Sequence, residues 1–72
     1  MTDKDRAIDA MCRASAWAAD VARVINDARE AAAAGDMDRA AALLRAARVA
    51  AAALRHDVGY ARIALGRARD DR

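Results

Sequence analysis

The chain has 72 residues, which is enough for one domain. Alanine supplies 24 residues, phenylalanine and proline are absent, and the net charge is only +2. A single cysteine, Cys12, excludes an intramolecular disulfide framework, and the longest uncharged central run, 49–54, is too short to cross a bilayer. The first ten residues lack the apolar segment of a signal peptide, so we expect a cytoplasmic protein that does not associate with membranes.

Residues 3–34 are predicted to form the first helix. Thr2 is a suitable N-cap, and Asp5 three residues later completes an approximate capping box. Apolar residues recur with helical spacing, and charged residues such as Arg6, Arg13 and Asp20 fall on the opposite side. The predicted core stripe consists of Ala7, Ala10, Ala14, Trp17, Val21, Val24, Ala28 and Ala31, with Met11, Ala18, Ile25 and Ala32 beside them.

Gly35 and Asp36 are predicted to form a tight turn. Glycine takes the left-handed conformation that closes a helix, and aspartate accepts backbone N–H bonds as the N-cap of the next helix. A linker between two separate units is excluded by this chemistry. The turn therefore predicts that the chain folds back on itself.

The second helix is expected over about 37–70, with two apolar columns at heptad spacing. The first column is Met37, Leu44, Ala51, Val58 and Leu65, and the second is Ala40, Ala47, Leu54, Ala61 and Ala68. Two helices of similar length joined by a two-residue turn predict an antiparallel hairpin. The fold class is thus all-α, with residues 1–72 as one helical-hairpin domain.

The segment GDMDRAAALLRAA resembles the turn and second helix of a tetratricopeptide repeat. Gly35, Asp36, Ala40, Leu44 and Ala47 match its glycine, aspartate, small and large positions. The chain has no closing proline and no second copy, and its helices are about twice too long. The resemblance implies shared turn chemistry.

The second helix carries more apolar surface than one neighbour can cover, which predicts self-association. Two hairpins would then pair into a homodimeric four-helix bundle with two-fold symmetry. The flank expected to form the dimer interface contains Leu43, Val49, Ala50, Ala53 and Ile63.

A second group of residues is a candidate protein-binding surface. Trp17 is the largest side chain of the chain, and Tyr60, His56 and Met11 are expected within a few helical turns of it. Aromatic residues and methionine are enriched where proteins bind one another. The alternative is that Trp17 fills the widest layer of an ordinary core.

Five arginines on the second helix are a candidate nucleic-acid-binding ridge: Arg45, Arg48, Arg55, Arg62 and Arg69. The last four are seven residues apart, so they share one helix face. Two interpretations stay open. The column either contacts phosphates or forms flanking ion pairs, such as Arg62 with Asp9. As a dimeric RNA-binding hairpin, the predicted structure resembles the plasmid copy-number regulator Rop in architecture, but the two share no motif.

The sequence contains no motif for catalysis, a cofactor or a metal site. His56 and Cys12 lack a third orienting group, and one His–Asp pair supplies too few ligands for a metal. We therefore expect a small, non-enzymatic regulatory protein of bacterial or phage type, with itself and one other protein as partners. Nucleic acid is the alternative partner.

Overall fold

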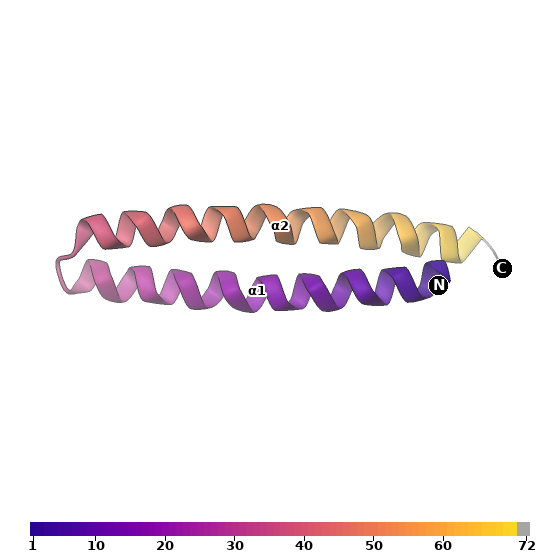
Figure 1. The fold of residues 1–72 in the computed structure, drawn as a ribbon, viewed down its shortest axis with the longest axis horizontal. Helices are drawn as coiled ribbons and strands as arrows, with labels where there is room; N and C mark the ends of the chain where they lie inside the picture. Colours follow the sequence, from indigo (N-terminus) through magenta and orange to yellow (C-terminus); the bar gives the residue numbers. More distant parts are fainter. Residues whose placement is uncertain (71–72) are drawn as a thin grey trace.

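The computed structural model describes residues 1–70 and contains two long helices, α1 (Asp3–Ala33) and α2 (Met37–Asp70). They lie side by side in opposite directions, so the start of α1 and the end of α2 are at the same end of the rod (Figure 1). The molecule measures 56 × 15 × 13 Å. The predicted all-α hairpin is confirmed, and residues 71–72, the last two of the predicted domain, lie outside the described residues.

α1 begins with a capping box. The Thr2 hydroxyl accepts a hydrogen bond from the Asp5 backbone N–H at 3.1 Å, and the Asp5 carboxylate accepts one from the Thr2 N–H at 3.3 Å. These bonds satisfy N–H groups that have no partner inside the helix. The prediction for this helix start is confirmed.

The turn between the helices is a Schellman motif followed directly by an N-cap. Gly35 has a φ of +86°, and its N–H donates to the Ala32 carbonyl while that of Asp36 donates to the Ala31 carbonyl. The Asp36 carboxylate then accepts a hydrogen bond from the Arg39 N–H at 3.1 Å. Both roles predicted for Gly35 and Asp36 are confirmed.

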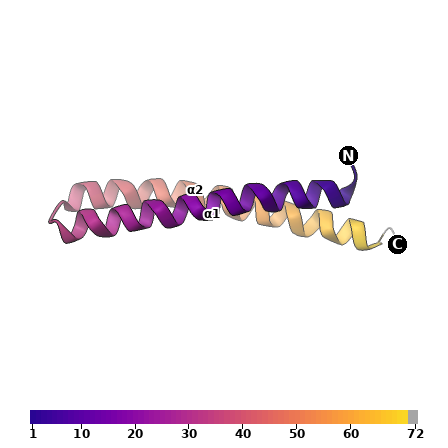
Figure 2. The same cartoon turned by 90° about the horizontal axis from the view of Figure 1, so that it is seen from below.

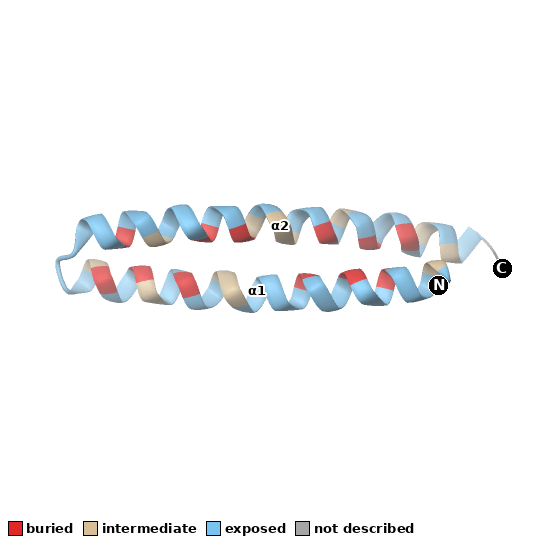
Figure 3. Cartoon of the chain, viewed as in Figure 1, coloured by how far each residue is buried: buried red, intermediate tan, exposed pale blue. Residues whose placement is uncertain are grey.

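The seam between the helices is lined with alanine (Figure 3). Val24 is the only buried apolar side chain larger than alanine in the part of the chain that the structure describes. The buried residues are Ala7, Ala10, Ala14, Val24, Ala28, Ala31, Ala40, Ala47, Ala50, Asp57, Ala61 and Ala64. Small side chains allow the two helices to approach closely, and they cross at a shallow angle when seen from below (Figure 2).

The predicted seam of α2 is wrong in one of its two columns. Ala40, Ala47 and Ala61 of the second column are buried, but Met37, Leu44, Val58 and Leu65 of the first are exposed. The column that replaces them against α1 contains Leu43, Ala50, Asp57 and Ala64, of which Leu43 is half-buried. The larger side chains are excluded because an alanine-lined α1 leaves little depth between the helices.

Between residues 1 and 70, neither helix has a stretch long and apolar enough to cross a membrane.

Candidate functional site

Most of the large apolar side chains lie outside the seam. Apart from Met1, which precedes α1, they belong to the two helices, and they are exposed by between 38% and 83% of their surface. These residues are Met1, Ile8, Met11, Trp17, Ile25, Met37, Leu44, Val49, Val58, Tyr60, Ile63 and Leu65. Apart from Met1 and Trp17, most of them lie on one of two surfaces, according to their position around each helix.

The first surface, which we name the two-helix face, has contributions from both helices. An antiparallel pair is related by an approximate two-fold axis perpendicular to both helices, so equivalent heptad positions emerge on the same side of the seam. α1 presents Met11, Ala18 and Ile25, each of which lies four residues after the first of the two seam residues in its heptad. α2 presents Leu44, Ala51, Val58 and Leu65 at the equivalent positions, and Ile8 of α1 borders them.

The register of the hairpin sets these residues level with one another. Arg13 contacts Asp57. Two residues, one from each helix, therefore lie level when their residue numbers add up to about 70. Met11 is therefore level with Val58, Ala18 with Ala51, and Ile25 with Leu44. The two-helix face is apolar across both helices over three successive heptads.

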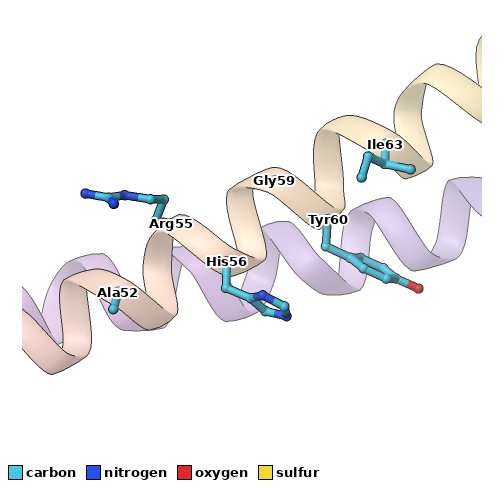
Figure 4. A pocket seen from close by; sticks show the side chains of 6 residues that line it. All are labelled: Ala52, Arg55, His56, Gly59, Tyr60 and Ile63. Atoms are coloured by element: carbon cyan, nitrogen blue, oxygen red, sulfur yellow. The ribbon is translucent and has the colours of Figure 1, made fainter.

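The second surface, which we name the outer surface of α2, is formed by Val49, His56, Tyr60 and Ile63. A shallow open groove of about 530 Å³ runs across it and is also lined by Ala52, Arg55 and Gly59. His56 and Tyr60 point to the same side of the helix, whereas Arg55 points away (Figure 4). Gly59 leaves open space above the backbone, since a Cβ atom there would have no neighbour within 4 Å.

The predicted protein-binding residues are divided between these surfaces. His56 and Tyr60 lie together in the groove, but Met11 is on the two-helix face. Trp17 occupies a seam position of α1 and is still 38% exposed, because its indole is too large for an alanine-lined seam. The structure does not bring the four residues into one patch.

The residues expected at the dimer interface are also divided. Val49 and Ile63 are exposed on the outer surface of α2, and Leu43 and Ala53 are half-buried. Ala50 is only 5% exposed and belongs to the seam within the hairpin, so the expectation that it lies on an outer flank is corrected. The shift of the α2 seam by one column accounts for this difference.

The arginine column comprises Arg48, Arg55, Arg62 and Arg69, with Arg45 beside it, and all five are exposed. None of them forms an ion pair with another residue in the range 1–70. The acidic residues expected to pair with them are occupied within α1 instead. Asp3 pairs with Arg6, Asp9 with Arg13, and both Asp20 and Asp27 with Arg23.

An ion pair joins the two helices and was not predicted from the sequence. Asp57 is the only buried charged residue of the described chain, and the Arg13 Nε donates to its carboxylate at 3.4 Å. Arg13 also binds Asp9 one turn earlier. Partial desolvation lowers the pKa of Arg13, but the hydrogen bonds and charges of Asp9 and Asp57 outweigh it and raise the pKa above its ordinary value. Arg13 therefore stays charged at every pH below its ordinary pKa, and this contribution to stability is lost only in stronger alkali.

No three His, Cys, Asp or Glu side chains within residues 1–70 gather where they could hold a metal ion. Cys12 is an exposed free thiol. Comparison of the chain with protein-family models, with curated proteins and with solved structures finds no match.

Proposed function

We propose that this chain is a small, non-enzymatic interaction protein that acts as a helical-bundle dimer by binding another macromolecule, most readily a protein. The exposed free thiol of Cys12 suits a reducing compartment, and we place the protein in the cytoplasm. Its role would be regulatory, because two helices without a catalytic constellation can act only through what they cover or hold together.

One observation carries this proposal: the hairpin buries alanine and exposes its large apolar side chains. Monomeric soluble proteins rarely leave extended apolar patches uncovered, and such patches mark sites of protein–protein contact. Here both helices expose them, on two different surfaces. The hairpin therefore has enough apolar surface for a second copy and for a further partner.

The outer surface of α2 is the better site for a different protein. Tyr60 and His56 combine apolar rings with polar tips, which is typical of residues that contribute most to binding. Gly59 allows the backbone of a partner to approach closely. Arg55 points away from His56 and Tyr60 and so places a positive charge at the edge of the groove, where it favours an acidic group on the flank of the partner. A partner helix with an apolar stripe and an acidic flank has the chemistry that this surface fits.

The test is affinity capture from lysate with and without nuclease, followed by direct binding of each captured protein in purified form. We expect nuclease-resistant recovery, and we expect Ile63→Asp to weaken direct binding at least tenfold. Ala16→Asp is the matched control, since it adds the same charge on the charged flank of α1. Equal binding by the two variants, or recovery only in the absence of nuclease, would contradict the proposal.

A second candidate function, a Rop-like RNA- or DNA-binding hairpin, is favoured by the arginine column. Its side chains are exposed and make no ion pairs in the described part of the chain, as a phosphate-contacting row requires. If the four arginines neutralise four phosphates, the logarithm of the affinity should fall with that of salt at a slope of about −3.6. Arg62→Gln should reduce the slope by about 1. Absence of binding to mixed RNA and DNA at low salt would exclude this function.

A further inference from the structure

We infer that the two-helix face is covered by a second copy of this chain, with the turns of both hairpins at the same end of the bundle. This inference rests on the proposed function and identifies the surface through which the dimer forms. It assigns dimerisation to Met11, Ile25, Leu44 and Val58. It leaves the outer surface of α2 open.

The two-helix face has the continuity that a second copy needs. Three level pairs, Met11–Val58, Ala18–Ala51 and Ile25–Leu44, cross from one helix to the other without a charged residue. On the opposite side of the hairpin, α1 instead presents a charged row that includes Arg6, Arg13, Asp20 and Asp27. Only one broad side of the hairpin is therefore apolar on both helices.

The area is also sufficient. The two-helix face extends along a rod 56 Å long and 15 Å wide. A second hairpin laid along it would cover roughly 800 Å² on each protomer, which is the area of a standard stable interface. A single added helix would leave one of the two apolar flanks in water, whereas a second hairpin covers both.

The arginine column decides the relative direction of the two copies. Arg48, Arg55 and Arg62 border the two-helix face on the outer edge of α2. If α2 lay against α2 of the partner, both arginine columns would share one edge and repel each other. If α2 lies against α1 of the partner, Arg62, Arg55 and Arg48 lie level with the uncharged residues Ile8, Ser15 and Ala22. Arg29, the next residue of that row, lies level with Ala41. Two-fold symmetry then places both turns at the same end.

The first experiment compares two valines of α2 that differ in the surface they occupy. Val58 is 44% exposed on the two-helix face, and Val49 is 73% exposed on the outer surface. In sedimentation at micromolar concentration, we expect the wild type and Val49→Asp at twice the 7.7 kDa chain mass. Val58→Asp should sediment as a monomer. A monomeric wild type, or a dimeric Val58→Asp, would overturn the inference.

A cross-linking experiment tests the arrangement without depending on a destabilised variant. In a Cys12→Ser background, Ala18→Cys is mixed with Ala51→Cys and the sample is oxidised. With both turns at one end, position 18 of one copy lies level with position 51 of the other, so we expect the mixed disulfide by mass spectrometry. Self-linked Ala18→Cys dimers would indicate opposed turns and overturn the inference, as would the absence of any cross-link.

The outcomes for the dimer and for the proposed function are separable. A dimer that captures nothing would contradict the proposed function and leave this interface in place. A monomer that binds a partner through Ile63 would contradict the interface and leave the binding role in place.

Discussion

Asp57 is the residue whose position is least expected from its chemistry. It lies in an alanine-lined seam, and its side chain is only 10% exposed. Removing a carboxylate from water is costly unless it is paired, and Arg13 supplies the paired charge from the opposite helix. A polar residue at one seam position also disfavours other alignments of two helices. We therefore interpret the pair as the contact that fixes the register of an otherwise uniform seam.

Loss of this pair should cost stability. Arg13→Ala leaves the Asp57 carboxylate buried without its partner, and we expect the melting temperature to fall by roughly 4–8 °C. Arg23→Ala is the control, because Arg23 pairs only within α1. Adding Asp57→Ala to Arg13→Ala should restore the melting temperature, since an alanine completes the seam. Thermal denaturation monitored by circular dichroism gives the melting temperatures of the wild type and the three variants. Equal effects of the two arginine substitutions would refute the role assigned to the Arg13–Asp57 pair.

At the scale of the elements, the sequence predicts where the helices begin and end better than how α2 is rotated. Local chemistry at Thr2, Gly35 and Asp36 decides the ends of the helices, and it is fully visible in the sequence. The rotation of α2 depends on which of three adjacent columns faces α1. Hydrophobicity favours the column with Leu44 and Val58 over the one with Asp57. Side-chain size decides the outcome, because alanine allows the closer approach and Arg13 compensates the charge.

The rotation of the helices also decides which residues share a candidate surface, and the sequence predicts this only in part. The shared location of His56 and Tyr60 follows from their spacing of four residues, which places them on one helix face. The separation of Met11 and Trp17 from them depends on the side of the seam, and therefore on the rotation of both helices. Ala50 was assigned to an outer flank for the same reason. When three adjacent columns of a helix are apolar, the sequence pattern does not show which columns face the other helix and which face solvent.

The two glycines inside α2 give a prediction at this scale. Gly59 and Gly66 are helical, and a Cβ atom at either would meet nothing within 4 Å. Replacing both with alanine should raise the free energy of unfolding by about 2 kcal/mol, because alanine favours the helix by ~1 kcal/mol at each position. Gly35→Ala is the contrasting variant, since its φ of +86° disfavours a side chain and should lower stability by about 1 kcal/mol. Urea denaturation measures these changes, and no gain from the double substitution would contradict the prediction.

At the scale of the whole molecule, the single hairpin is too extended to bury much of its surface. Its radius of gyration is 16.3 Å, compared with ~11 Å for a globular chain of this length. Its accessible surface of 5379 Å² also exceeds the ~4,300 Å² expected for a globular monomer of this mass. Helix propensity makes the two helices form readily, but the alanine seam adds little apolar burial. The proposed dimer would add apolar burial by covering surface that the single hairpin leaves exposed.

Association makes thermal stability depend on protein concentration. If the native hairpin is dimeric and the unfolded chain is not, mass action favours the folded state as concentration rises. For two chains of 72 residues, the melting temperature should increase by roughly 4–5 °C for each tenfold increase in concentration. Calorimetry between 10 and 1000 μM, or circular dichroism in cells of different path length, measures this slope. Val58→Asp should melt lower and without the slope, whereas Val49→Asp should keep it. A wild type that melts at the same temperature throughout the range would mean that the hairpin is stable as a single copy.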